Sequence, residues 1–346
     1  MSRALEIKSP QGKILSFGEL LLRICPDADG EWLNDNQLPF FVGGAELNVA
    51  TALALWDLPS AYFTALPGNA MSKQITDYLQ QKKVDASSVF TTGERIGLYY
   101  LTRGKDIKNN ALIYDRAGSA FATLKPGQVD WDKVLDGVSW FHFSAICPAI
   151  SQDAADVCLE VLEAASAKNI TISIDLNYRS KLWKYGKEPI DIMPKLAGYA
   201  DLMMGNIWAA EMMLGIPIAP DIHESGQKSI YLKEALQTSE SIMVQYPKCK
   251  AVANTFRFDA GKGIEYYTAL YTGDKLYNSN QYDTDEVIDK VGSGDCFMAG
   301  LIYGFYNNQD PRQTLEFATA AAYTKLFIEG DATNKTVEEI IKAIKS

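Results

Sequence analysis

The sequence has no long run of apolar residues, and this excludes several classes of protein at the outset. Its first residues, MSRALEIKSPQGKILSFGE, contain neither the apolar core of a signal peptide nor a membrane-spanning stretch. Basic residues are also scarce, because 33 lysines and arginines stand against 43 aspartates and glutamates, for a formal net charge of −10. Such a chain has no bulk attraction for nucleic acid or for an acidic membrane surface. We expect a cytoplasmic protein whose partners are small molecules.

The cysteines form no recognisable pattern. Their number is odd and no CxxC pair occurs, which argues against a disulfide framework and against a zinc site. We interpret them as free thiols in a reducing compartment. They are Cys25, Cys147, Cys158, Cys249 and Cys296.

Linkers, low-complexity tracts and internal repeats are absent as well. The 346 residues, 47% of them hydrophobic, are enough to build one large core. We therefore predict a single domain that spans residues 1–346.

What the sequence does contain is a regular alternation of strand and helix patterns. KILSFGELLLRICP predicts a strand that starts near Ile14, GGAELNVATALALWDL a helix opened by a glycine pair, and AYFTALPG a short buried strand. Further on, VSWFHFSAI and ITISIDLNYR predict strands, separated by a helix with Ser151 as its N-cap. This alternation predicts right-handed βαβ units, and therefore an α/β fold with a mainly parallel sheet and helices on both faces.

One region interrupts the alternation. Residues 91–123 read TTGERIGLYYLTRGKDIKNNALIYDRAGSAFAT and contain no pattern of helical length. IGLYYLTRG and NNALIYDRA instead predict two strands joined by a polar turn at KDIKNN. Residues 20–42 could add further strands beside them. Together these segments predict a small β-sheet that covers one edge of the core as a lid, and the alternative is a surface hairpin without a role.

The stretch VIDKVGSGDCFMAGLIYGF, residues 287–305, carries the most specific chemical signal. Two glycines flank Ser293 and suggest a backbone shape that side chains would block, and the run that follows has helical spacing. A glycine-rich turn that opens a helix directs free N–H groups at one point and suits an anion, whereas the plain alternative is a helix-capping turn. A dinucleotide-binding dehydrogenase is disfavoured, because its glycine motif would follow the first strand.

Further polar residues lie where strands end, which is where a parallel sheet binds ligands. In DLNYR, Asp175, Asn177 and Arg179 share one face if the chain stays extended. Asn206 stands between a strand and a helix in MMGNIWAAE. Each has a plain alternative: Asn206 can serve as an N-cap alone, and Asp175 with Arg179 can form a surface ion pair. Arg116 of the lid can be an ordinary solvated charge.

Two separated motifs carry a family resemblance. DKVGSGDCFMAGLIYGF resembles the C-terminal signature of the ribokinase-like (PfkB) carbohydrate kinases, and FVGGAELNVATALALW is similar to the family's N-terminal signature. Within the family, the chain most resembles 2-keto-3-deoxygluconate kinases, through GLYYL, YDRAGSA and DLNYRSKLW. The resemblance implies a ribokinase-like three-layer α/β/α core with a mainly parallel sheet and a small β-strand lid.

The resemblance also implies which residues contact a sugar. YDRAGSA matches the Tyr-x-Arg-x-x-Ser-Ala motif of those kinases, with Ser119 and Ala120 at its end. The arginine of this motif would face the carboxylate and keto end of the sugar, helped by two tyrosines. The implied sugar contacts are Gly44, Asn48, Tyr99, Tyr114, Arg116 and Arg179.

The implied reaction is ATP-dependent phosphorylation of the terminal, sixth-carbon hydroxyl, with Mg²⁺ carried by the nucleotide. Asp295 would act as the base that removes or orients the hydroxyl proton, which contributes about 10²–10⁴-fold. The N–H groups of Gly292, Ser293 and Gly294 would hold the charge on the transferring phosphoryl group. The implied nucleotide contacts are Asn177, Asn206, Thr255, Arg257 and Gly330.

Several positions depart from the family pattern. The family often has Asn-x-x-Glu near the phosphates and Mg²⁺, but here Glu211 follows Asn206 by five residues, a spacing that rotates the carboxylate away on a helix. Metal ligands therefore stay unassigned. AVANTFRFDAGKG replaces the usual glycine-containing nucleotide strand. We interpret Cys296, at a helix N-terminus, as a buried inert thiol and not a low-pKa one, and His142 as structural.

Three functions remain open at this point. They are a sugar-acid kinase, a fructokinase- or ribokinase-like kinase of a neutral sugar, and a non-catalytic sugar- or nucleotide-binding protein. Arg116 separates the first two, because a neutral ketose needs no buried cation. The intact GSGD argues against the third, and the altered Asn-x-x-Glu keeps it in play. Exposed lid strands favour a homo-oligomer, and we predict a dimer through the lid.

Overall fold

The structure, a computed structural model, describes residues 12–26, 37–102, 112–222, 226–260 and 263–345. Its helices are α1 (Ala45–Leu55), α2 (Ala70–Gln81), α3 (Trp131–Val134), α4 (Gln152–Ala167), α5 (Pro189–Ala197), α6 (Ile207–Leu214), α7 (Lys228–Gln245), α8 (Ser293–Tyr306), α9 (Pro311–Lys325) and α10 (Val337–Ala343). No helix in these ranges is both long and apolar enough to cross a membrane.

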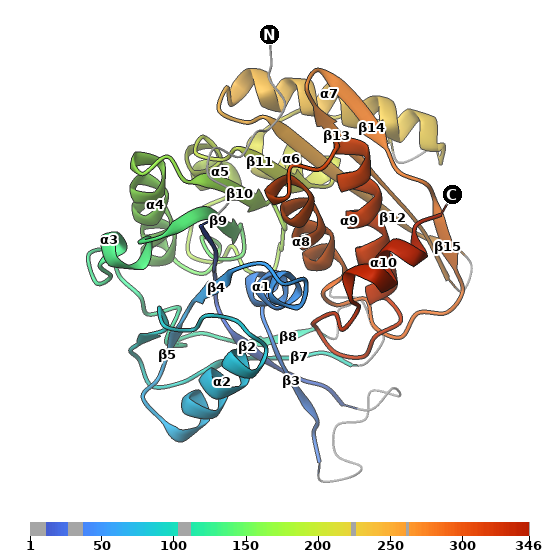
Figure 1. The fold of residues 1–346 in the computed structure, drawn as a ribbon. Coiled ribbons are helices and arrows are strands. Elements are labelled where there is room, and N and C mark those ends of the chain that lie inside the picture. The colour runs from blue at the N-terminus through green and yellow to red at the C-terminus, as the bar shows by residue number, and fades with distance from the viewer. Residues whose placement is uncertain (1–11, 27–36, 103–111, 223–225, 261–262, 346) are drawn as a thin grey trace.

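A large sheet forms the centre of the molecule (Figure 1). In spatial order its strands are β14 (Lys275–Asn278), β13 (Gly263–Thr272), β12 (Ala251–Ala260), β11 (Leu202–Gly205), β10 (Thr171–Asp175), β9 (Val138–Ser144), β1 (Lys13–Phe17) and β4 (Ser60–Phe63), and β15 (Tyr282–Thr284) pairs with β13. Strands β4, β1, β9, β10, β11 and β12, which are neighbours in this order, are parallel. Strand β13 pairs antiparallel with β12, β14 and β15. The predicted mainly parallel α/β sheet is confirmed.

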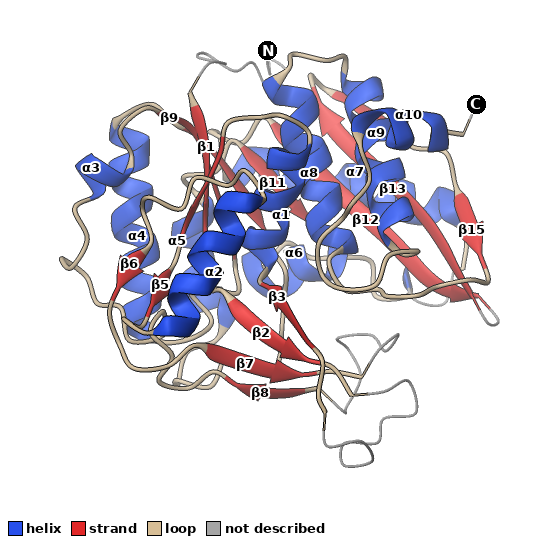
Figure 2. Cartoon of the chain, turned by 60° about the horizontal axis from the view of Figure 1, so that its bottom comes forward, coloured by secondary structure: helices blue, strands red, loops and turns tan. Residues whose placement is uncertain are grey.

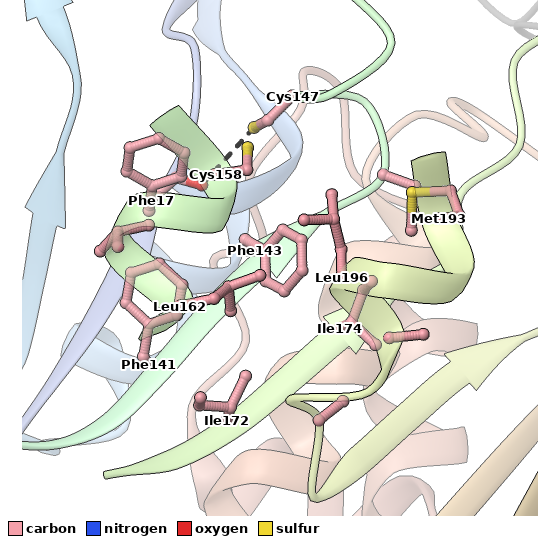
Figure 3. Packing of buried hydrophobic residues seen from close by; sticks show 14 of the residues in the cluster. Phe17, Phe141, Phe143, Cys147, Cys158, Leu162, Ile172, Ile174, Met193 and Leu196 are labelled. Carbon is pink, nitrogen blue, oxygen red and sulfur yellow. Dashed lines mark hydrogen bonds between the residues drawn. The ribbon is translucent and has the colours of Figure 1, made fainter. Parts of the chain in front are cut away.

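Helices cover both faces of this sheet, because successive residues of its strands point to opposite sides. Leu15 and Phe141 are register partners and belong to a hydrophobic cluster with α4, α5 and α6. Their chain neighbours Ile14 and Trp140 are also register partners, but pack into a second cluster with α1, α8 and α9. Figure 3 shows the first cluster, where aromatic rings of β1 and β9 meet aliphatic side chains of α4 and α5. The three-layer arrangement follows from these two apolar faces.

Two stretches that the patterns assign to single strands are each divided between two sheets, which corrects those predictions. KILSFGELLLRICP forms β1 in the large sheet and β2 (Leu21–Ile24) in a small one. The break falls at Gly18, where a Cβ would lie 2.0 Å from Glu46 Oε2, so a larger residue there would displace the buried Glu46 side chain. AYFTALPG likewise divides after Phe63 into β4 and β5 (Ala65–Leu66), and β5 pairs with β6 (Phe90–Thr91).

The small sheet comes from the two regions from which a lid was expected. Its order is β3 (Phe40–Gly43), β2, β7 (Gly97–Tyr100) and β8 (Ile113–Asp115). Strand β2 pairs antiparallel with β3 and parallel with β7, and β7 pairs antiparallel with β8. Figure 2 shows this sheet as a separate layer beside the core, below α1. The predicted polar turn KDIKNN lies outside the described residues, and the single-domain organisation stays a prediction.

Other local predictions can be compared with the structure directly. Ser151 caps α4, since its side chain accepts a hydrogen bond from the Ala154 N–H. All five cysteines are buried free thiols. His142 is buried on β9 with Nδ1 3.0 Å from Ser173 Oγ, and burial lowers its pKa to about 3, as expected of a structural histidine.

Candidate active site

A cavity of about 720 Å³ lies at the carboxyl ends of the parallel strands, between the large sheet and the small one. This volume is in the range that small-molecule sites occupy. The cavity brings together fifteen of the residues singled out from the sequence. They are Gly44, Asn48, Tyr99, Tyr114, Arg116, Asp175, Asn177, Arg179, Asn206, Thr255, Arg257, Gly292, Ser293, Gly294 and Asp295.

The turn that opens α8 has the shape of an anion cradle. Gly292 caps the helix in the left-handed conformation, with φ +79°, and makes no side-chain cap. A Cβ on Gly292 would lie 1.8 Å from the Asp331 carbonyl oxygen, so only glycine fits there. The first intrahelical bond runs from the Cys296 N–H to the Gly292 carbonyl. Helix geometry therefore leaves the N–H groups before Cys296 without an intrahelical acceptor, and the helix dipole adds positive potential there.

The two residues that follow Gly292 divide their roles between fold and cavity. Ser293 is buried and its hydroxyl donates to the Ala322 carbonyl on α9, so its side chain anchors the turn to the core. Gly294 is exposed, and a Cβ built on it would meet no atom of the described residues within 4 Å. Glycine at 294 is therefore not required by packing. It leaves the space above the turn open.

Asp295 lies in the first turn of α8 and faces the cavity. Its Oδ2 accepts a hydrogen bond of 2.7 Å from Asn48 Nδ2 on α1. Burial, together with the nearby carboxylates of Asp175 and Glu46, raises the pKa of Asp295 to about 8 against the opposing effect of Asn48. A carboxyl group with a pKa near neutrality can both accept and return a proton.

Asp175 ends strand β10 on the same wall. Burial raises its pKa to about 7, and the hydrogen bond from the Asn177 N–H to Oδ1, 3.0 Å long, opposes that shift. The same bond turns the chain, so DLNYR does not continue as a strand past Asp175. Asn177 and Arg179 still reach the cavity, from the loop. No direct ion pair joins Asp175 to Arg179 within the described ranges.

Arg116 enters the cavity from the lid, but it is already paired. The Glu19 carboxylate, in the connection between β1 and β2, accepts hydrogen bonds from Arg116 Nε, at 2.7 Å, and from Nη2. Its other oxygen accepts a bond from the Ser119 hydroxyl. All three side chains are buried. Arg116 is thus neither a solvated charge nor an unpaired one.

A second buried arginine joins the lid to the C-terminal segment. Arg23 on β2 contacts Asp289 through Nη2, at 2.5 Å, and Asp331 through Nε, at 2.8 Å. Asp331 also accepts a 2.7 Å hydrogen bond from the hydroxyl of Tyr99, whose ring lines the cavity. This cluster places the lid against the turn that opens α8.

Asn206 serves as a cap and as a wall of the cavity at once. Its side chain accepts a 2.7 Å hydrogen bond from the Ala209 N–H at the start of α6, and the residue also lines the cavity. Glu211, on the same helix, is exposed and is not among the lining residues. This agrees with the rotation expected from its spacing.

Two further residues named from the sequence lie away from the cavity wall. Gly330 is not among its lining residues, and a Cβ there would lie 2.9 Å from the Phe41 ring, so this glycine packs against the lid. Cys296 is buried, its thiol donates to the Ala321 carbonyl, and burial raises its pKa to about 12. An activated thiolate is excluded there, as the sequence interpretation held.

The structure also adds lining residues that sequence reasoning missed. Glu19 follows strand β1, and Glu46 lies in the first turn of α1. Glu19 could have been found from the sequence, because polar residues just past the ends of parallel strands usually face the ligand site. Trp208, Tyr231 and Phe258 form an aromatic wall near Thr255 and Arg257. The spacing of these aromatics carries no pattern that marks them.

Comparison with known proteins assigns the family. Residues 11–337 match the family of pfkB family carbohydrate kinases. The chain belongs to the pfkB family of carbohydrate kinases. A 2-dehydro-3-deoxygalactonokinase of Haloferax volcanii is 26% identical over 336 residues, 96% of each chain. A probable fructokinase-4 of Arabidopsis thaliana is 25% identical over 295 residues, 84% of this chain and 81% of the relative.

Solved structures of the pfkB family agree with the sequence match. The crystal structure of 2-dehydro-3-deoxygluconokinase from Thermotoga maritima superposes with a TM-score of 0.85 at 32% identity, covering 96% of this chain and 98% of that one. The ribokinase-like fold expected from the resemblance is confirmed. The protein is a carbohydrate kinase, and its relatives include kinases named for sugar acids and for fructose.

Among the described residues of this pfkB kinase, no group of three histidine, cysteine, aspartate or glutamate side chains could hold a metal ion. The cavity offers amide oxygens and single carboxylates instead. Such a donor set suits a Mg²⁺ ion that keeps most of its ligands from phosphate and water. We assign no residue as its ligand.

Proposed function

We propose that this chain transfers the γ-phosphoryl group of ATP to the terminal, sixth-carbon hydroxyl of a keto sugar acid, most specifically 2-keto-3-deoxygluconate. The observation that carries the proposal is the arrangement of Asp295 directly beside an open glycine turn, with Arg116 of the lid on the wall of the same cavity. The turn and Asp295 suit phosphoryl transfer, and Arg116 suits a carboxylate.

Asp295 is the proposed base. Its raised pKa makes the ionised form a stronger base toward the attacking hydroxyl, and Asn48 holds the carboxylate in place through its amide. Asn48 Oδ1 is buried and has no hydrogen-bond partner in the part of the chain that the structure describes. An unpaired amide oxygen in the cavity wall is a natural acceptor for a sugar hydroxyl.

The turn of Gly292, Ser293 and Gly294 is the proposed anion hole. Its N–H groups hold the charge that develops on the transferring phosphoryl group, while Asp295 acts on the hydroxyl at the other end of the in-line transfer. A bound Mg²⁺ would neutralise charge on the nucleotide phosphates. Asn177, Asn206, Thr255 and Arg257 are the proposed nucleotide contacts, and Gly330 is left out of this set because it packs against Phe41 of the lid.

The sugar-acid assignment rests on Arg116 and on named relatives. Nη1 of Arg116 forms no hydrogen bond to any described residue, and the side chain lines the cavity beside Tyr114. A charge-assisted bond from a guanidinium to a carboxylate contributes about 1.5–3 kcal/mol. Relatives at 26% and 32% identity are named for 2-dehydro-3-deoxygalactonate and 2-dehydro-3-deoxygluconate. Gly44, Tyr99 and Arg179 complete the proposed sugar site.

Turnover on a defined substrate panel tests the proposal. ATP consumption with Mg²⁺ is measured against 2-keto-3-deoxygluconate, its galactonate epimer, fructose, ribose and 5-ketogluconate. Preference for a carboxylated sugar supports the assignment. Preference for fructose or ribose keeps the kinase and discards the substrate, and no turnover on any of them removes both Asp295 as base and the substrate.

A neutral-sugar kinase is the second candidate, and one observation favours it. The Glu19 carboxylate already neutralises Arg116, so the lid end of the cavity is not a bare cation. The fructokinase relatives are consistent with such a site. The same substrate panel separates the two candidates.

We also propose that two copies associate through the small sheet. Its outer strands are edges, and Phe40 and Ile113 on them are exposed. Light scattering tests this association: twice the mass of one chain supports it, and the mass of one chain removes it.

A further inference from the structure

The pair of Glu19 and Arg116 has a feature that a plain substrate-binding arginine would not need. Glu19 is 3% exposed and Arg116 is 6% exposed, yet both line the cavity. The two residues come from segments far apart in the chain: Glu19 from the connection after strand β1, and Arg116 from the end of lid strand β8. A buried carboxylate on a substrate-facing cation changes both the direction and the charge of that cation.

The first effect is on direction. Glu19 Oε2 accepts bonds from Nε and Nη2 of Arg116, which occupies one edge of the planar guanidinium. The remaining group, Nη1, has no partner among the described residues. Arginine otherwise has many rotamers to lose on binding, so a guanidinium held along one edge presents Nη1 to the cavity already ordered.

The carboxylate is itself held on both oxygens. Oε1 accepts a bond from the Ser119 hydroxyl, in the turn that follows β8. The lid leaves room for this arrangement at Gly97 on β7, where a Cβ would lie 2.6 Å from Glu19 Oε1 and 3.3 Å from Arg116 Cβ. A larger residue at 97 would displace the pair. Gly97, Ser119 and Glu19 together hold the Arg116 side chain in one position.

The second effect is on charge. The guanidinium attracts a substrate carboxylate, but a substrate group bonded to Nη1 shares this one guanidinium with the Glu19 carboxylate. Two like charges on one cation repel each other in a partly buried site. The pair therefore weakens the preference for a carboxylated sugar that Arg116 alone would impose.

We propose that Glu19 is a specificity-determining residue, which positions Arg116 by one edge and sets how strongly the site prefers a carboxylated sugar over a neutral one. The inference rests on the proposed sugar site at Arg116. It holds whichever sugar the wild-type enzyme prefers, because it concerns the ratio of the two.

The test compares Glu19→Gln with Ser119→Ala. For each variant, kcat/KM is measured on 2-keto-3-deoxygluconate and on fructose, together with KM for ATP. Glutamine keeps an acceptor for Arg116 and removes the negative charge, so the acid-to-neutral ratio rises about tenfold, through a lower KM for the acid. Ser119→Ala keeps the charge, and its ratio stays within about twofold of wild type while both substrates lose some activity.

A readout with salt distinguishes charge from structure. The gain in ratio for Glu19→Gln shrinks as ionic strength rises, because added salt screens part of the interaction. A purely structural role for Glu19 would lower both substrates equally at every salt concentration. That result, or an unchanged ratio, overturns the proposal.

A second pair of variants covers the case in which Glu19→Gln fails to fold because Arg116 loses its counter-charge. Arg116→Gln is compared with the double variant Arg116→Gln and Glu19→Gln, which contains no unpaired charge at this position. Removal of Glu19 in this background again raises the ratio about tenfold. An equal ratio in the two variants overturns the proposal.

Failure of the proposed function gives a different result. If wild type prefers fructose and Glu19→Gln still raises the acid-to-neutral ratio, the substrate assignment fails and the role of Glu19 stands. If wild type prefers the sugar acid and the ratio does not move, the assignment stands and the role of Glu19 fails.

Discussion

Arg23, Asp289 and Asp331 form a fully buried cluster of charge next to the α8 turn. Asp175 and the half-buried Asp295 form a second cluster on the wall of the cavity. In the first cluster, every charged group finds a partner of opposite sign within 2.5–2.8 Å. In the second, neither carboxylate forms a direct ion pair, and Asn48 is the only side chain among the described residues that donates a hydrogen bond to Asp295.

The difference shows in how each cluster holds its charge. Burial raises the pKa of Asp175 to about 7 and that of Asp295 to about 8, although the nearby Arg179 opposes both shifts. A carboxyl group with a raised pKa destabilises the folded state when it is ionised. Groups of this kind are common at catalytic sites. We call the cluster of Arg23, Asp289 and Asp331 closed, because its charges are paired, and the cluster of Asp175 and Asp295 open. The closed cluster connects lid strands β2 and β7 to the C-terminal segment. We therefore expect the closed cluster to govern stability and the open one to govern turnover.

The largest effect is expected from Asp295→Asn. The amide keeps the size and the contact with Asn48 but cannot accept the hydroxyl proton, so kcat falls about 10²–10⁴-fold. Thermal unfolding should be unchanged or slightly improved, because a buried carboxylate has been removed. Steady-state kinetics and calorimetry measure the two quantities. Full activity in this variant would remove the base assignment, and a large loss of stability would place Asp295 with the closed cluster.

The next effect is expected from Arg23→Met. Two aspartates are then left buried without their cation, which lowers the free energy of unfolding by about 3–5 kcal/mol. Urea unfolding measures it. Lys83→Met is the control, because Lys83 and Asp57 form an exposed pair with side chains 75% and 81% exposed, and little change is expected there. A stable Arg23→Met variant with lost turnover would assign Arg23 to the catalytic side.

The pH dependence separates the clusters without mutation. The base must be ionised, so kcat/KM should rise about tenfold per pH unit up to about pH 8 and then level off. Stability moves in the opposite direction. The folded state holds this proton more tightly than the unfolded chain, whose carboxyl group has a pKa of about 3.8, so the free energy of unfolding falls between about pH 4 and pH 8. Asp295→Asn should flatten the activity profile and remove its own share of the stability slope, while Asp175, whose pKa burial raises to about 7, keeps the rest. A stability slope as steep as that of wild type would contradict the assignment.

The smallest effect is expected from Gly294→Ala. No atom lies within 4 Å of the added Cβ, so folding should be unaffected, while the methyl group narrows the anion hole and lowers kcat by about tenfold. Gly292→Ala is the matched comparison, because its Cβ would lie 1.8 Å from the Asp331 carbonyl and φ is +79°. That variant should unfold at lower temperature. Equal thermal stability of the two would contradict the difference assigned to these glycines.

Local patterns were sufficient for much of the fold and for the chemical end of the site. The alternation of strands and helices predicted the parallel sheet, because each element buries a face that its own residues define. GSGD predicted the open helix N-terminus, since its turn and helix are contiguous in the chain. Predictions failed at Gly18 and after Phe63, where an apolar run continues in sequence but the chain passes from one sheet to another.

The amino-acid sequence by itself determined the elements, the glycine turn and the presence of a lid, because these depend on residues within a few positions of one another. Only the tertiary structure decided which charged side chains are fully paired and which keep a group free for a ligand. Arg23 meets Asp289 across 266 positions and Arg116 meets Glu19 across 97. Pairing over such separations depends on how sheets and loops pack, and no local pattern distinguishes an arginine that is fully enclosed from one that keeps an edge for a ligand.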